Sequence, residues 1–220
     1  LIQREFTENA SHELQTPIAI IRSKLDLLMQ EDLNERQMSL VSDLYDINIR
    51  IGHLNRNLLL LAKIENAQYT KLEDIDLFNV TNTLLPMYGV LQNGLSISIE
   101  DHRTRQSTLR ANITLLECLL NNLIINAIRH TTSANGEIKI VIEDDSLSVS
   151  NEAEGEALDG QTLFQRFRSD NTKKVGNGLG LSIAKAICDF HGWSVQYSFS
   201  NNRHIFTVWL KKTNQHAQLP

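Results

Sequence analysis

The chain has 220 residues, of which 10 are glycine and three are proline, and its 21 lysines and arginines stand against 26 acidic residues, a net charge of −5. So little glycine and proline excludes collagen-like and mucin-like proteins, and a chain of this length buries a core without disulfide or metal staples. The mild negative charge argues against nucleic acid or an anionic membrane as the main partner, because both select basic faces. Cys118 and Cys188 lie far apart without metal-ligand spacing, so we expect two reduced, buried thiols.

The first 65 residues have the periodicity of two long helices. Apolar residues from 2 to 29 recur at steps of three and four, the mark of an amphipathic helix, and the polar segment 31–34 interrupts them. A heptad seam then continues to about residue 65, through Leu40, Leu44, Ile47, Ile51, Leu54, Leu58 and Leu61. One antiparallel hairpin cannot cover both its faces, so we expect a homodimer in which two hairpins form a four-helix bundle.

The polar segment 66–74 breaks the seam and marks the predicted boundary between two domains. We expect a helical domain over 1–66, a linker over 67–74, a second domain over 75–212 and a tail over 213–220. In the second domain helical and strand periods are mixed, which is typical of a layered α/β sandwich. Helices are expected at about 81–92, 112–130 and 179–191, and strands at 75–80, 95–100, 107–110, 136–143, 146–151, 194–200 and 204–210.

His12 stands in the segment SHELQTP of the first predicted helix. At 100° per residue it points away from the apolar stripe and toward water. An isolated exposed histidine usually has no role, but here Glu13 is adjacent, Thr16 is one turn further, and Pro17 removes a backbone hydrogen bond and bends the helix. An imidazole beside a carboxylate can act as a nucleophile, because the carboxylate takes the proton from one ring nitrogen while the other attacks.

A second group of polar residues lies in the predicted helix with the sequence NNLIINAIRHT. Asn122 and Asn126 are one turn apart and share a helical face with Arg129 or His130. Taken alone, this pattern is equally consistent with solvated amides.

The segment VGNGLGLSIAKAI carries a third pattern, with glycines at alternate positions before a helix. Such glycines let backbone amides approach phosphate, and the helix offers its positive N-terminus. A dinucleotide-binding fold is disfavoured, because the motif does not open a βαβ unit near a first strand and no acidic ribose partner is evident. The residues concerned are Gly176, Gly178, Leu179 and Gly180.

Over about residues 6–210 these segments resemble the sensor histidine kinases of bacterial two-component systems. FTENASHELQTP is similar to their H-box, NNLIINAIRHT to the N-box, LFQRFRS to the F-box and VGNGLGLSIAKAI to the G2-box. The resemblance implies that His12 accepts the γ-phosphoryl group of ATP and that Glu13 is the general base. It also implies that Thr16 orients water for removing phosphate from a partner response regulator.

The resemblance further implies an ATP-binding domain of the Bergerat type, a mixed sheet with helices on one face, as in gyrase, Hsp90 and MutL. In such a domain Asn126 ligates Mg²⁺, Asn122 lies near the phosphates, Arg129 contacts phosphate and His130 stacks by the adenine. Mg²⁺ prefers oxygen ligands with phosphates completing the shell. The polar and basic segment 168–175, RSDNTKKV, suits a mobile lid from which Arg168, Lys173 or Lys174 reaches phosphate. The glycine-rich segment is expected to add phosphate contacts from Gly176, Gly178, Leu179 and Gly180.

One segment departs from the family's pattern. Where the family has DxGxG to seat adenine, this chain has Asn151, Glu152, Ala153, Glu154 and Gly155. The amide oxygen of Asn151 can still accept a hydrogen bond from the adenine amino group. A Cβ atom at Ala153 is expected to narrow the pocket or to resist an unusual backbone angle, at a cost in nucleotide affinity.

The implied function is autophosphorylation of His12 by ATP and transfer of the phosphoryl group to an aspartate of a response-regulator receiver domain, with phosphatase activity as an addition. Because Leu1 already lies inside a helical pattern and no apolar run has the length of a membrane span, we expect the cytoplasmic portion of an inner-membrane sensor. Two alternatives stay open. One is a degenerate module that binds or dephosphorylates a receiver, and the other is an ATPase of the gyrase or Hsp90 type, which has no reason to carry SHELQTP.

Overall fold

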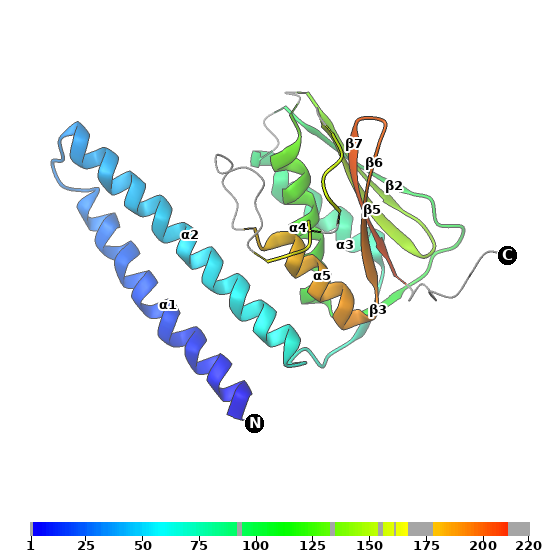
Figure 1. The fold of residues 1–220 in the computed structure, drawn as a ribbon, viewed down its shortest axis with the longest axis horizontal. Coiled ribbons are helices and arrows are strands. Elements are labelled where there is room, and N and C mark those ends of the chain that lie inside the picture. Colours follow the sequence, from blue (N-terminus) through cyan, green and yellow to red (C-terminus); the bar gives the residue numbers. More distant parts are fainter. Residues whose placement is uncertain are drawn as a thin grey trace. The chain divides into compact units, whose positions relative to one another are not determined.

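The computed structural model describes residues 2–91, 94–132, 135–153, 156–160, 162–166 and 178–210 (Figure 1). For residues 2–12, 90 and 91 it describes the backbone alone. The chain divides into two compact units, with the boundary between Gln68 and Tyr69. None of the helices in the described ranges is both long enough and apolar enough to cross a bilayer.

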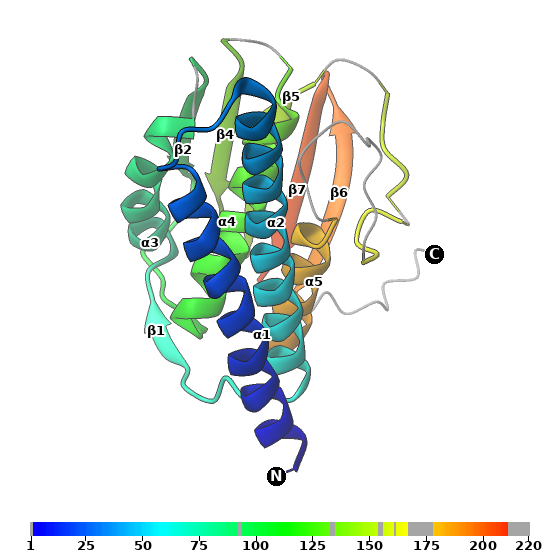
Figure 2. The same ribbon diagram turned by 90° about the vertical axis from the view of Figure 1, so that its left-hand side faces the viewer.

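The first unit is a hairpin of two long helices, α1 (Ile2–Leu28) and α2 (Glu35–Glu65), which run side by side in Figure 2. The turn ends at Asn34, whose side chain accepts a hydrogen bond from the backbone of Gln37 at 2.9 Å. The Gln37 side chain in turn accepts from the Asn34 backbone at 3.0 Å. This reciprocal capping satisfies two amides that the start of a helix leaves unpaired, and it confirms the predicted break.

The face that α2 turns toward α1 differs from the predicted heptad seam. Asn48 donates a hydrogen bond to the carbonyl oxygen of Ile18 at 3.2 Å, and a Cβ atom on Gly52 would lie 3.5 Å from a methyl carbon of Ile18. The guanidinium of Arg22 lies 5.7 Å from the ring centre of Tyr45. Because these contacts occupy one side of α2, four members of the predicted seam are left exposed in the hairpin, namely Leu40, Leu44, Ile47 and Ile51, at 47 to 55%, whereas Leu61 near the end of α2 is buried.

The second unit is built on a five-stranded mixed sheet with the strand order β2-β4-β5-β7-β6. Its strands are β2 (Ser96–Asp101), β4 (Glu137–Ile142), β5 (Ser146–Glu152), β6 (Ser194–Ser200) and β7 (Arg203–Trp209). Strands β2 and β4 are parallel, and every other neighbouring pair is antiparallel. A separate antiparallel pair joins β1 (Glu73–Ile75) to β3 (Leu109–Ala111).

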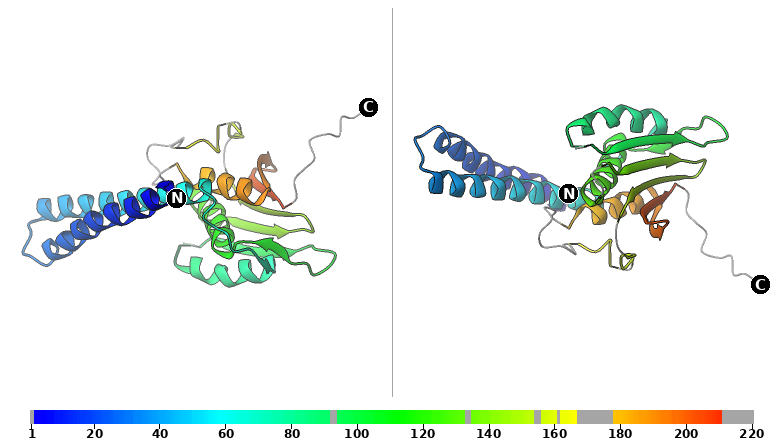
Figure 3. Two further views of the ribbon diagram at one scale, coloured as in Figure 1. Left: turned by 90° about the horizontal axis from the view of Figure 1, so that it is seen from below. Right: turned by 90° about the horizontal axis from the view of Figure 1, so that it is seen from above.

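Helices cover one face of this sheet (Figure 3). They are α3 (Leu77–Leu84), the 3₁₀ helix η1 (Leu85–Leu91), α4 (Ile113–His130) and α5 (Gly180–His191). The sheet side of the core consists of Ile138, Ile140, Ile142, Leu147, Val149, Phe206 and Val208, all buried. Most of the alternate residues of the strands are polar, and some form ion pairs, such as Lys139 with Glu100 at 2.9 Å, so the other face suits contact with water. This arrangement confirms the predicted mixed sheet with helices on one face.

The predicted strand over 75–80 is wrong. Strand β1 ends at Ile75, and α3 begins at Leu77 because Asp76 caps it. The Asp76 carboxylate accepts hydrogen bonds from the backbone amides of Phe78 at 2.9 Å and Asn79 at 3.3 Å. The short apolar run fits the period of a strand or of a helix, and the capping carboxylate selects the helix.

Candidate functional site

Helix α4 carries the two asparagines of the predicted nucleotide site. It begins where the Asn112 side chain accepts a hydrogen bond from the backbone of Leu115 at 3.1 Å. Its apolar stripe is fully buried, at Leu115, Leu116, Leu119, Leu120, Leu123 and Ile124. Asn122 and Asn126 lie beside that stripe and are half-buried. Burying the leucines therefore fixes the direction of both amides.

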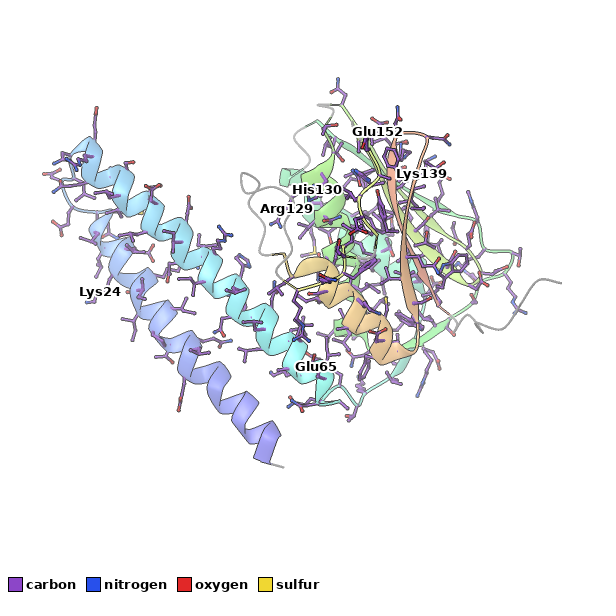
Figure 4. All side chains as sticks on the ribbon, in the orientation of Figure 1. Lys24, Glu65, Arg129, His130, Lys139 and Glu152 are labelled. Carbon is purple, nitrogen blue, oxygen red and sulfur yellow. The ribbon has the colours of Figure 1, made fainter. Side chains whose placement is uncertain are left out.

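The C-terminal end of α4 and the end of β5 lie at the same edge of the sheet. The chain passes from His130, the last residue of α4, to β4, whose second residue, Ile138, pairs with Asn151 near the end of β5. Figure 4 shows Arg129 and His130 together on this part of α4, and both are exposed. The C-terminal end of α4 and Asn151 thus lie at the same edge of the sheet.

The side-chain amide of Asn122 is hydrogen-bonded within α4 and faces the start of α5. Its nitrogen donates to the carbonyl oxygen of Cys118 at 2.8 Å and contacts the sulfur at 3.4 Å. Its oxygen lies 3.0 Å from where a Cβ atom on Gly180 would stand. Burial raises the pKa of the Cys118 thiol to about 11, so the group stays protonated at neutral pH. Sequence reasoning gave Cys118 no role, although its spacing of four residues from Asn122 was a usable signal.

The residues before α5 take the conformation that a glycine-rich turn requires. Gly178 has a φ of 63°, in the left-handed region that favours glycine, and Leu179 is completely buried. The N-cap residue of α5, Leu179, has an apolar side chain, and no capping hydrogen bond from it to the first amides of α5 is present in the described part of the chain. Those amides and the helix dipole are therefore suited to an anion.

Asn151 is 1% exposed, and its amide is only half satisfied. The nitrogen donates to the backbone oxygen of Glu152 at 3.1 Å, whereas the oxygen is buried without a hydrogen-bond partner among the described residues. An unpaired buried acceptor is costly, so this atom is suited to a ligand that brings a donor. The amino group of adenine is such a donor.

The expected backbone strain at Ala153 is wrong. Ala153 does not have a positive φ, and its amide donates to the carbonyl oxygen of Asn202 at 3.0 Å. The alanine is therefore compatible with the backbone of the base site, and a glycine is not needed there for its conformation.

In the first unit, the backbone of His12 lies in α1, while its side chain is outside what the structure describes. Glu13 and Thr16 are exposed on the same helix, which continues through Pro17. Four other predicted ligands are outside the described residues, namely Gly155, Lys173, Lys174 and Gly176, as is Arg168. Among the residues that are described, no cluster of three His, Cys, Asp or Glu side chains could hold a metal ion.

Comparison with known proteins matches each unit to a domain family. Residues 2–67 match the His Kinase A (phospho-acceptor) domain. Residues 111–214 match the Histidine kinase-, DNA gyrase B-, and HSP90-like ATPase domain.

Two curated relatives are similar over nearly the whole of this chain. The sensor histidine kinase HprS of Escherichia coli is 30% identical over 218 residues, which cover 96% of this chain and 48% of HprS. The heme sensor protein HssS of Staphylococcus saprophyticus is 27% identical over 218 residues, 96% of this chain and 47% of HssS. The chain therefore spans about half the length of these curated relatives.

Among solved structures, the histidine kinase AdeS of Acinetobacter baumannii is similar with a TM-score of 0.62 and 25% identity, covering 92% of this chain and 98% of the AdeS chain. A phospho-acceptor domain is followed in this chain by an ATPase domain, and the chain belongs to the histidine kinase family.

Proposed function

We propose that this chain is the catalytic core of a sensor histidine kinase, which phosphorylates itself on His12 with ATP. The observation that carries the proposal is that Asn122 of α4 lies against Gly180 at the start of α5, in a chain that matches both a phospho-acceptor domain and an ATPase domain. The proposed boundaries are 1–66 for the phosphoacceptor domain, 67–74 for the linker and 75–212 for the catalytic domain.

The described residues fit a nucleotide. The unpaired oxygen of Asn151 can accept the adenine amino group, and the uncapped amides at the start of α5 can bind phosphate. Asn122 already packs against Gly180, so a side chain there would displace it. The exposed Arg129 adds a positive charge at the same end of α4, and His130 lies next to it.

Asn126 is the proposed ligand of Mg²⁺. Its side chain is half-buried on α4, one turn beyond Asn122, and it makes no hydrogen bond to a described residue. An amide oxygen suits Mg²⁺ when phosphate oxygens and water complete the shell. When bound, the ion would neutralise charge on the transferring phosphoryl group.

His12 and Glu13 would carry the transfer itself. One ring nitrogen of His12 attacks the γ-phosphorus, the bond to the bridging oxygen breaks, and ADP leaves. Glu13 takes the proton from the other ring nitrogen. Most of the rate gain comes from positioning and charge neutralisation, because phosphoryl transfer has a loose transition state.

The proposed dimer explains the uncovered apolar face of α2. Within one hairpin, Leu44 and Ile47 are each 52% exposed, although they belong to a regular heptad seam. Soluble proteins rarely expose such a stripe, and a second copy of the hairpin would cover it in a four-helix bundle.

The partner we propose for the phosphorylated protein is the receiver domain of a response regulator, which accepts the phosphoryl group on an aspartate. Thr16, exposed one turn from His12, would orient water in the reverse reaction, the dephosphorylation of that regulator. Because the relatives are about twice as long, we also propose that this core is the cytoplasmic part of a larger inner-membrane sensor.

The proposal is tested by incubating the purified chain with γ-labelled ATP and Mg²⁺. We expect label on the protein, its loss in Asn126→Ala, and its retention in Thr114→Ala, an exposed control on the same helix. Release of free phosphate without labelled protein would favour the gyrase-like ATPase. An unlabelled chain that still binds a receiver would favour the degenerate module.

A further inference from the structure

The neighbour of Asn151 in the sheet is a histidine that the family resemblance did not single out. In the register of β5 and β7, Asn151 pairs with His204 and Val149 pairs with Phe206. Val149 and Phe206 are buried in the core, and alternate residues of a strand share a face, so the side chains of Asn151 and His204 lie on that same face. Directly paired residues have Cβ atoms about 5 Å apart. His204 is therefore the cross-strand neighbour of the residue that carries the unpaired amide oxygen.

Hydrogen bonds assign the proton of this imidazole. The hydroxyl oxygen of Tyr197 accepts the backbone amide of Leu158 at 3.0 Å and lies 2.8 Å from Nδ1 of His204. Among the described residues this hydroxyl has no other hydrogen-bond acceptor, so its own proton is directed at Nδ1, which makes Nδ1 an acceptor. Burial lowers the pKa of His204, so the ring is neutral at pH 7. A neutral ring that accepts at Nδ1 carries its proton on Nε2.

The pair consequently offers one acceptor, Oδ1 of Asn151, and one donor, Nε2–H of His204. The Watson–Crick edge of adenine presents the complementary order, a donating 6-amino group beside an accepting N1. Hypoxanthine and guanine present the reverse order, an accepting O6 beside a donating N1–H. The two protein groups match adenine and oppose the 6-oxopurines.

We propose that His204 is a specificity residue of the nucleotide site, donating from Nε2 to N1 of the adenine while Asn151 accepts from the 6-amino group. The inference rests on the proposed function, because it assumes that a nucleotide binds at the end of β5. It goes beyond that function by naming a second base contact and the class of base that is rejected. It also assigns a role to the Tyr197 hydroxyl, which fixes the tautomer of His204.

A series of ligands tests the contact on the unaltered chain. Calorimetric titration measures the affinity for three nucleotides: ADP, IDP and 1-deaza-ADP, in which a CH group replaces N1. Together they separate the hydrogen bond to N1 from the hydrogen bond to the 6-amino group. We expect 1-deaza-ADP to bind about 3- to 10-fold more weakly than ADP, as for one neutral hydrogen bond, and IDP to bind more weakly still. Equal affinity for ADP and 1-deaza-ADP would overturn the inference.

The same titrations on the variant His204→Phe show whether the preference for ADP over 1-deaza-ADP depends on His204. Phenylalanine keeps an aromatic ring and removes both nitrogens. We expect it to bind ADP about 3- to 10-fold more weakly than the wild type and to lose the preference for ADP over 1-deaza-ADP. The control His102→Phe, on an exposed histidine at the end of β2, should keep that preference. If His204→Phe still prefers ADP, His204 does not contact N1. A wild type that binds none of the three nucleotides would refute the proposed function itself. A wild type that binds ADP, but whose preference for ADP over 1-deaza-ADP does not depend on His204, would refute only the role of His204.

Discussion

The amide oxygen of Asn122 on α4 lies 3.0 Å from the position that a Cβ atom would take on Gly180, the first residue of α5. At the last residue of α5, Nε2 of His191 accepts the backbone amide of Asn112, which caps the start of α4, at 3.1 Å. Helix α5 therefore contacts α4 at both of its own ends, near the middle of α4 and at the start of α4. A small displacement at either contact should change the nucleotide affinity more than it changes the stability of the fold.

Replacing Gly180 with alanine should weaken nucleotide binding by about 3- to 10-fold, as expected for the loss or distortion of one hydrogen bond. The added methyl would press on the Asn122 amide and turn it from its present position. Calorimetric titration with ADP measures the effect. Gly89→Ala is the matched control, because a Cβ atom there would meet nothing within 4 Å. Equal losses in the two variants would contradict the proposed crowding.

Protonation of His191 should destabilise the second unit below about pH 6.5, the ordinary pKa of histidine. Burial lowers the pKa of His191 in the folded state, and its Nε2 must be unprotonated to accept from Asn112. The unfolded chain therefore binds the proton more readily, so stability is present above the unfolded pKa and is lost as the pH falls through the folded pKa.

The measurement is the thermal midpoint between pH 7.5 and 5 for the wild type and for His191→Phe. The variant should start lower and show a shallower decline, since the phenyl ring keeps the stacking on Trp193 but cannot be protonated. His204, whose pKa is also lowered, stays in both proteins, so only the difference in slope is assigned to His191. Parallel slopes would show that His191 does not contribute.

Asn151→Leu should separate function from stability. Leucine removes the unpaired buried oxygen, so the thermal midpoint should be unchanged or higher, although the bond to the Glu152 carbonyl is lost as well. Nucleotide affinity should fall by about 10-fold or more, because the base loses its acceptor. Calorimetry and a thermal scan on the same sample give both values. A leucine variant that binds ADP normally would show that this oxygen does not face the base.

The sequence predicted most helices and strands of this chain, because they are long and strongly periodic. It failed over 75–80, where the run is short and the capping carboxylate of Asp76 selects the helix. It also predicted a heptad seam on α2, yet could not tell that the hairpin contact uses Asn48 and Gly52 instead. Which side of a helix meets which neighbour depends on tertiary packing.

Parts of the candidate site lay beyond sequence reasoning for a related reason. Asn122, Asn126 and Gly180 were predictable from motifs within single segments. His204 was not, because it is brought beside Asn151 by the pairing of β5 with β7, and that register follows from the whole sheet. The roles predicted for His12, Glu13 and Thr16 remain predictions.

Charge placed on the exposed seam of α2 should separate the proposed dimer. Ile47→Glu would bury a carboxylate between two hairpins, at a cost that an apolar interface cannot offset. Light scattering after size exclusion should give a dimer for the wild type and a monomer for Ile47→Glu. Ser42→Glu, on an exposed position outside the seam, should stay dimeric. A dimeric Ile47→Glu would place the interface elsewhere.

The central claim is that this chain transfers the γ-phosphoryl group of ATP to His12. The most direct measurement is incubation with γ-labelled ATP and Mg²⁺, followed by acid and alkali treatment and by the same assay on His12→Gln. The account predicts protein-bound label that is lost in acid, survives alkali and is absent from His12→Gln. Label that survives acid, or that persists in His12→Gln, would contradict it.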